Sequence, residues 1–131
     1  MKSSSSALWA GALVVLVAAC APTSQPAAPA PAPTGLSAEA QQGQQLMAQK
    51  GCGACHTIPG VAGATGNIGP GLAGVATRAT IAGGAVPNNG PADLQRWILD
   101  PPTVKPGTQM PKLGLTEQEA QQMVAYLENL R

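Results

Sequence analysis

Two cysteines and a histidine stand together in this chain, in the segment Cys52-Gly53-Ala54-Cys55-His56. Thiols three positions apart can each add across one vinyl group of a haem, forming two thioether bonds, and the next residue then places an imidazole beneath the iron. His56 is the only histidine in the sequence, so it has no rival as the proximal ligand. The spacing predicts one covalently bound haem c, attached at Cys52 and Cys55 with His56 on the iron.

Two other chemistries use the same residue types. A thiol-disulfide oxidoreductase would use Cys52 and Cys55 alone, in a strand–helix context, and the sequence shows no βαβ pattern. A tetrahedral zinc site needs four ligands, whereas these five residues supply three. Both alternatives remain open from spacing alone, but haem attachment is the favoured interpretation.

A methionine is expected as the second axial ligand. Beyond the N-terminal segment the candidates are Met47, Met110 and Met123. Met47 and Met123 fall in segments predicted to be helical, where packing in the core explains them. Met110 lies in the loop 105–111, where prolines on both sides can hold its thioether at a fixed distance from the iron. A methionine ligand raises the reduction potential relative to most alternatives.

Three helices are predicted to position these groups. Residues 37–50 begin with a capping serine and stop at a glycine. Residues 91–99 start with a proline, which the first turn tolerates, and a Pro-Pro pair follows them. Residues 116–130 open with a capping box and carry apolar side chains at helical spacing. One further helical turn is expected near residues 72–77, and no strand is predicted.

The composition fits one domain with an additional segment, because the chain has 131 residues. It has no Phe, one Tyr and two Trp, so its own side chains make a thin core. A large apolar ring in the interior would compensate. The formal net charge is +1 and there is no basic stripe, so we expect no nucleic-acid partner.

The N-terminus has the layout of a bacterial secretory signal. Lys2 is followed by a short apolar run over residues 7–19, too short for a membrane span. The residues around Cys20 resemble a lipobox, which predicts a signal peptide at 1–19 and a lipid on Cys20. Residues 20–35 are rich in Pro and Ala and would form a tether of at most about 45 Å. The folded domain is expected at 36–131.

Several of these segments resemble class I cytochromes c. The resemblance covers residues 36–130 and rests on the CGACH segment, the IGPGLAGV segment at 68–75, the PGTQMP loop and the C-terminal helix. It implies an all-α fold of three to four helices around one covalent haem, with Gly/Pro-rich loops. In that family the first and last helices cross closely, and Gly43 and Tyr126 occupy the matching positions. Met47 stands where the family often has an aromatic residue, so a looser crossing is expected.

Residues 78–88 and 94–101 are similar to the cytochrome c domain fused to subunit II of some bacterial haem-copper oxidases. One histidine and two haem-bound cysteines cannot build a binuclear copper site. The resemblance therefore implies that module without its copper domain, as a lipid-anchored monomer on the periplasmic or outer face of a bacterial membrane.

The resemblance also assigns roles by position. The Pro70 carbonyl should accept a hydrogen bond from the free His56 nitrogen, while Arg78 and Trp97 are candidates to meet the haem propionates. Two axial ligands leave no open coordination position, so we expect electron transfer and no enzymatic activity. The resemblance implies a quinol-oxidising complex as donor and a terminal oxidase as acceptor in a respiratory chain. The alternative is a haem sensor or small haem enzyme in which Met110 is displaced.

The contact surface for these partners is expected to be largely apolar. Val104, Pro111 and Ile58 are the predicted apolar members. Three lysines could flank the exposed haem edge: Lys50, Lys105 and Lys112.

Overall fold

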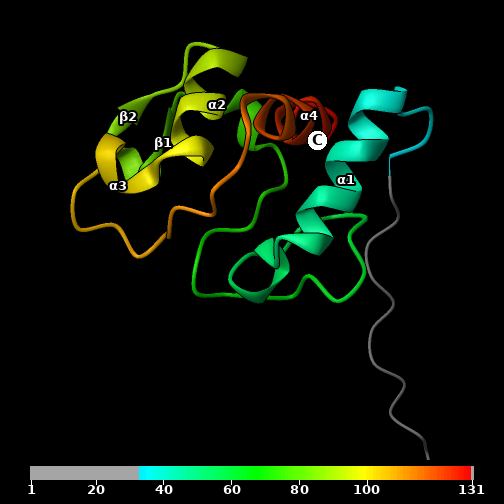
Figure 1. Cartoon of the computed structure of the whole chain (residues 1–131), viewed down its shortest axis with the longest axis horizontal. Coiled ribbons are helices and arrows are strands. Elements are labelled where there is room, and N and C mark those ends of the chain that lie inside the picture. Colours follow the sequence, from blue (N-terminus) through cyan, green and yellow to red (C-terminus); the bar gives the residue numbers. More distant parts are fainter. Residues whose placement is uncertain (1–32, 131) are drawn as a thin grey trace, which may run out of the picture.

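The computed structural model describes residues 33–130. The predicted signal peptide at 1–19 and the lipidation site Cys20 lie outside this range, so they stay predictions. Helix α1 (Ala38–Gln49) packs against α4 (Glu117–Leu127), and α2 (Pro91–Leu99) packs against α4 and α3 (Pro101–Val104). Figure 1 shows α1 on one side of α4, and α2, α3 and a small hairpin on the other. Within residues 33–130, no helix has both the length and the apolar character to cross a bilayer.

Local capping explains where α1 and α4 begin. The Ser37 hydroxyl accepts a hydrogen bond from the Ala40 N–H at 3.2 Å. Thr116 and Glu119 form the predicted capping box, in which each side chain accepts from the backbone N–H of the other. These contacts satisfy N–H groups that have no partner inside a helix. The predicted helical segments are confirmed, with ends one to three residues inside the predicted bounds.

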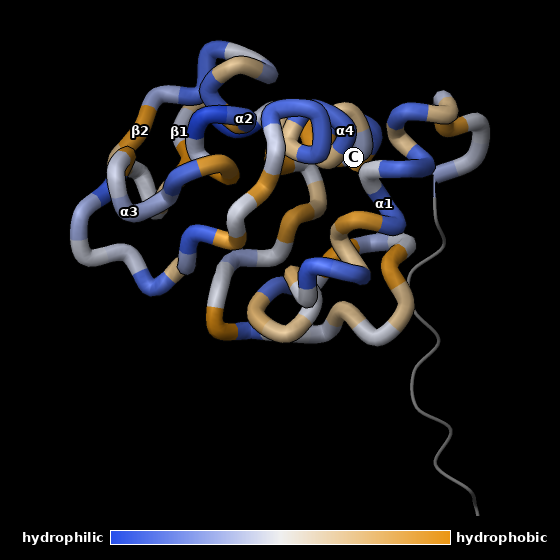
Figure 2. Tube along the Cα trace, viewed as in Figure 1, coloured by the Kyte–Doolittle hydropathy of each residue, from blue (hydrophilic) through white to orange (hydrophobic). Residues whose placement is uncertain are grey.

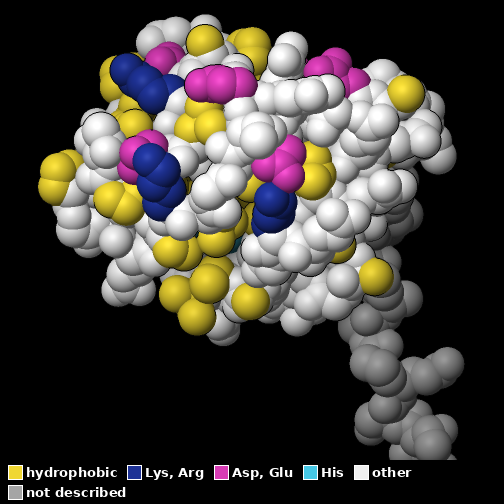
Figure 3. Space-filling model, in the orientation of Figure 1, with side chains coloured by type: hydrophobic (Ala, Val, Ile, Leu, Met, Phe, Trp, Pro, Cys, Tyr) yellow, Lys and Arg dark blue, Asp and Glu magenta, His cyan; other side chains and the backbone are white. Residues whose placement is uncertain are grey.

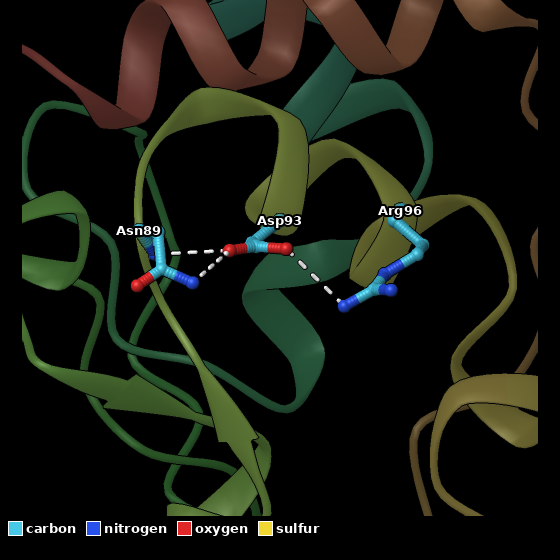
Figure 4. A network of polar contacts seen from close by, with 3 residues as sticks. All are labelled: Asn89, Asp93 and Arg96. Carbon is cyan, nitrogen blue, oxygen red and sulfur yellow. Dashed lines mark hydrogen bonds and ion pairs between the residues drawn. The ribbon is translucent and has the colours of Figure 1, made fainter.

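A carboxylate organises the start of α2. Asp93 accepts hydrogen bonds from the backbone N–H of Asn89 at 2.9 Å and from its side-chain amide at 3.0 Å (Figure 4). Arg96 lies one turn further on and pairs with the same carboxylate at 3.2 Å. The backbone hydrogen bond from Asn89 is the main reason that the pKa of Asp93 is below its ordinary value. The network joins the residues just before α2 to the helix itself.

The crossing of α1 and α4 is a contact between backbones. A Cβ atom at Gly43 would lie 1.9 Å from the Gln122 carbonyl oxygen, so only glycine fits there. Tyr126 is fully buried on α4, and its hydroxyl donates to the Pro59 carbonyl. Met47 is only 3% exposed and is enclosed in the core despite replacing an aromatic residue. The close crossing that the resemblance implies at Gly43 is therefore present, and the looser packing expected from Met47 is not observed.

The structure is mostly helical, but it also has a two-stranded antiparallel sheet. Strand β1 (Thr80–Ile81) pairs with β2 (Val86–Pro87), and a short 3-10 turn, η3 (Ala82–Gly84), joins them. The hydrophobic members Ile81 and Val86 are partners in the register and are both buried. Figure 2 shows hydrophobic segments in both strands. The strictly all-α prediction was therefore incomplete, because two-residue strands are too short to show period-two alternation.

Helix α3 also differs from the sequence prediction. The Pro101-Pro102 pair was expected only to end the preceding helix. Instead, the Asp100 side chain caps a new turn and accepts from the Thr103 N–H at 3.3 Å. Proline is favourable in a first helical turn, where its missing N–H costs nothing. The same dipeptide therefore both stops α2 and starts α3. The single turn expected near residues 72–77 is η2 (Val75–Thr77).

We predict that Gly43→Ala destabilises the fold by about 3 kcal/mol, because the added methyl must push two backbones apart. Guanidinium unfolding of the purified protein measures this as a lower midpoint. Gln45→Ala is the control, since Gln45 is exposed on the same helix, and it should change stability by less than about 0.5 kcal/mol. Equal stability of the two variants would contradict a backbone contact at Gly43.

Candidate functional site

A cavity of about 490 Å³ lies among α1, α4, α2, the turn after α1 and the loop before α4. Its lining is mainly apolar, and its volume lies in the range of cofactor sites. Seven of the predicted site residues border it: Cys52, Cys55, His56, Pro70, Arg78, Trp97 and Met110. The fold therefore gathers residues that lie up to 58 positions apart in the sequence around one hollow.

The two cysteines are placed by a tight turn directly after α1. Gly51 adopts a left-handed conformation with φ of 73°, which ends the helix and starts the 3-10 turn η1 (Cys52–Ala54). A Cβ atom at Gly53 would lie 2.7 Å from the Ala64 Cβ, so this turn packs directly on the next loop. Both thiols are free and partly buried.

Burial raises the pKa of the Cys52 thiol. Thiol–disulfide exchange requires a thiolate, so a raised pKa disfavours this activity at neutral pH. Two free thiols beside a large apolar cavity are instead the arrangement that covalent attachment of a ring needs. The structure therefore weighs against the oxidoreductase alternative.

The His56 imidazole is held on two sides. Its Nδ1 lies 2.8 Å from the Pro70 carbonyl oxygen, and because that oxygen can only accept, Nδ1 is the donor. The backbone of Gly69 lies against the ring, where a Cβ atom would fall 2.3 Å from His56 Cε1. Nε2 is then the ring nitrogen with a free lone pair, as a metal ligand requires.

All three methionines of residues 33–130 border the cavity, but they differ in setting. Met47 and Met123 are 3% and 1% exposed and belong to the helical core. Met110 lies on the loop before α4, is partly buried, and its backbone N–H donates to the Thr108 hydroxyl at 3.3 Å. Of the three methionines, Met110 is therefore the one whose side chain does not pack between helices.

Arg78 makes contacts that the sequence did not indicate. Its Nη2 donates to the carbonyls of Gly71 at 2.6 Å and Ala73 at 2.9 Å while the side chain also lines the cavity. Trp97 lines the cavity and packs against the hydrophobic core. Both residues border the cavity, and their contact with the haem propionates stays a prediction.

Three lysines make contacts within the domain: Lys50 and Lys105, which border the cavity, and Lys112, which follows the bordering Pro111. Lys50 pairs with Glu119 at 2.8 Å and Lys112 pairs with Asp100. The hydrogen bond from Lys50 lowers the pKa of Glu119. The ammonium group of Lys105 donates to the Ala82 carbonyl at 2.8 Å. Figure 3 shows basic side chains next to acidic ones, with apolar side chains around them.

The predicted apolar surface needs one correction. Ile58 is only 2% exposed, because its N–H bonds the Ala64 carbonyl and the 58–64 turn folds it into the core. It cannot contact a partner, and that prediction was wrong. Ile68 is 69% exposed at the cavity and is the exposed large hydrophobic residue of the described chain. The sequence signal was its place in a Gly/Pro-rich loop, where an apolar side chain has little to pack against.

The cytochrome c family model matches residues 40–131, and this chain belongs to the cytochrome c family. Members of that family bind covalently attached haem c, so haem c is the cofactor. The chain is also similar to cytochrome c oxidase subunit 2 of Alkalihalophilus pseudofirmus, with 32% identity over 106 residues. That match covers 74% of this chain and 30% of the relative, so the chain spans about a third of that protein's length.

The residues present fit a covalent haem on four observations. The cavity is apolar and of cofactor size. Two free thiols border it, and the imidazole beside them has Nδ1 occupied and Nε2 free. A loop methionine lines another part of the wall.

We predict that Gly69→Ala displaces the His56 ring, because its Cβ would overlap three ring atoms. The purified variant should carry less haem per chain and unfold at a lower temperature, as measured by absorption and calorimetry. Gly71→Ala is the matched control, since its nearest neighbours, in Thr57, are 4.0 Å away. Equal haem content and melting temperature in the two variants would refute the contact with the ring.

Proposed function

We propose that this chain carries single electrons on one haem c bound through Cys52 and Cys55, with His56 and Met110 as axial iron ligands. The observation that carries the proposal is that the side chains of these four residues all border the same cavity. The turn after α1 and the loop before α4 supply separate parts of its wall. The haem, when bound, supplies a one-electron iron couple.

The chain's own residues would hold that group and shield it. The Pro70 carbonyl and the Gly69 backbone fix the imidazole, which sets the ligand's orientation. Buried Leu94 and Ile98 of α2 line the cavity and exclude water from it. If His56 and Met110 both bind the iron, they would leave no iron position free for oxygen or peroxide. This ligand set supports electron transfer over catalysis.

We predict that Met110→Ala abolishes the ferric methionine–iron absorption band and lowers the reduction potential, because the thioether favours ferrous iron. Absorption spectroscopy and a redox titration measure both effects. Met47→Leu and Met123→Leu are the controls, and each should keep the band. An intact mass of the same samples reads out the haem and any lipid on Cys20.

Two outcomes would overturn the ligand assignment. If the band survives in Met110→Ala and is lost in one control, that control's methionine is the ligand. If the wild-type ferric protein is high-spin and binds carbon monoxide readily when reduced, the sensor or small-enzyme alternative replaces electron transfer.

For the cellular setting, we infer an exported protein tethered by a lipid on Cys20, with its domain at 36–131. A tether would raise its local concentration near membrane partners. The relative named cytochrome c oxidase subunit 2 supports a terminal oxidase as electron acceptor. A quinol-oxidising complex is the corresponding donor.

The docking surface we propose is the apolar rim of the cavity. Ile68 is 69% exposed there, and Pro111 of the Met110 loop is also exposed. The lysines nearby are engaged within the domain, which weakens the concentrated field that electrostatic steering needs. The acceptor should therefore present a mainly uncharged, apolar surface.

We predict that Ile68→Ser slows electron transfer to a purified cytochrome c oxidase about tenfold, through lost apolar contact. Stopped-flow kinetics at several salt concentrations measure this, and the wild-type rate should vary little with ionic strength. Ala62→Ser is the control, because Ala62 is exposed away from the cavity. A steep fall of the wild-type rate with salt would contradict an apolar contact.

A further inference from the structure

We propose that Arg78 is a positioning residue for His56 and acts through the loop 69–73 that carries the Pro70 carbonyl. The inference deepens the proposed function, because it concerns how the proposed iron ligand is held. It rests on hydrogen bonds from Asn88 to Arg78 and from Arg78 to the loop, whose adjacent residue Pro70 accepts from the imidazole.

The first step is the contact between Arg78 and the loop. One guanidinium nitrogen, Nη2, bridges the carbonyls of Gly71 and Ala73 at 2.6 and 2.9 Å. Hydrogen bonds from a charged donor are stronger than neutral ones. Both acceptors belong to exposed residues outside regular secondary structure, which have no helix or strand to hold them. Arg78 therefore supplies the constraint that a helix or strand would otherwise give.

The second step is the contact between the loop and the histidine segment. The Gly69 N–H donates to the Cys55 carbonyl at 2.8 Å, and the Leu72 N–H donates to the Thr57 carbonyl at 2.9 Å. Between these two bonds, the Pro70 carbonyl accepts from His56 Nδ1. The carbonyl that Arg78 holds, that of Gly71, is the next one along the chain. A shift of Gly71 therefore moves the oxygen that orients the imidazole.

The third step is the anchoring of Arg78 itself. The Asn88 side-chain amide donates to the Arg78 carbonyl at 2.8 Å and to those of Val75 and Ala76 at 3.2 and 3.3 Å. Its backbone N–H donates to the Ala79 carbonyl at 3.0 Å. Asn88 Oδ1 is buried without a partner in the described chain, and such an atom costs folding free energy. The three carbonyls bonded by the Asn88 amide fix the backbone from which the Arg78 side chain projects.

This role is compatible with the propionate contact predicted for Arg78, because a guanidinium has five N–H donors and the loop uses one nitrogen. Replacing Arg78 with lysine separates the two roles. Lysine keeps the positive charge, but its ammonium ends one covalent bond short of Nη2 and lacks the planar fork. A charge role survives Arg78→Lys, whereas the bridge to the loop does not.

The experiment uses the haem-loaded, reduced protein labelled with ¹⁵N. We compare wild type, Arg78→Lys and Arg78→Gln by NMR, reading the His56 Nδ1–H signal and the exchange of the Gly69 and Leu72 amides. Both variants should speed these exchange rates about tenfold, the effect expected for losing a charge-assisted hydrogen bond. The Nδ1–H signal should also shift. Arg96→Gln is the matched control, since Arg96 pairs only with Asp93 on α2 and should leave all three signals unchanged.

The outcomes separate this inference from the proposed function. If Arg78→Lys matches wild type while Arg78→Gln does not, Arg78 acts through its charge and the inference is overturned. Unchanged signals in both variants overturn it as well. Should Arg78→Gln fail to fold, Arg78→Lys alone decides. A methionine–histidine spectrum in wild type upholds the proposed function in either case, while its absence refutes that function whatever the exchange data show.

Discussion

The hydrogen bond between His56 Nδ1 and the Pro70 carbonyl is the contact on which the site depends. It fixes which ring nitrogen is free, and it can form only because Gly69 lets the backbone lie against the imidazole. The rest of the loop is bonded on one side to the histidine segment and on the other to Arg78. The His56 ring is thus held by backbone carbonyls of a loop that lies outside regular secondary structure.

Around the cavity, lysine side chains are bonded within the domain, whereas part of the apolar surface is exposed. The lysines that could have formed a basic ring instead join separate segments: Lys50 links α1 to α4, and Lys105 links the Met110 loop to the hairpin. Ala82, the acceptor for Lys105, has a φ of 56°, an uncommon value for a residue with a side chain. The rim keeps an exposed isoleucine, so the lysines join segments of the wall while part of the apolar surface stays exposed.

Sequence reasoning succeeded where the signals were local. The caps at Ser37 and Thr116 placed α1 and α4 because they involve neighbours within one turn, and the family match agrees with the class indicated by the CGACH segment. It failed where the outcome depends on tertiary contacts. The burial of Ile58, the partners of the lysines and the loop contacts of Arg78 are set by segments that only folding brings together. The capped turn of α3 was missed because its Pro-Pro pair is also a common stop signal.

The crossing of α1 and α4 has a consequence for how the domain assembles. Gln42 and Gln122 are hydrogen-bonded across it and lie 80 positions apart, so the contact closes almost the whole domain into a ring. Closing a flexible loop of that length costs roughly 4 kcal/mol of chain entropy. The packing of α1 on α4 must offset that entropy, so neither helix is expected to be stable without the other, and the domain should unfold as one cooperative unit.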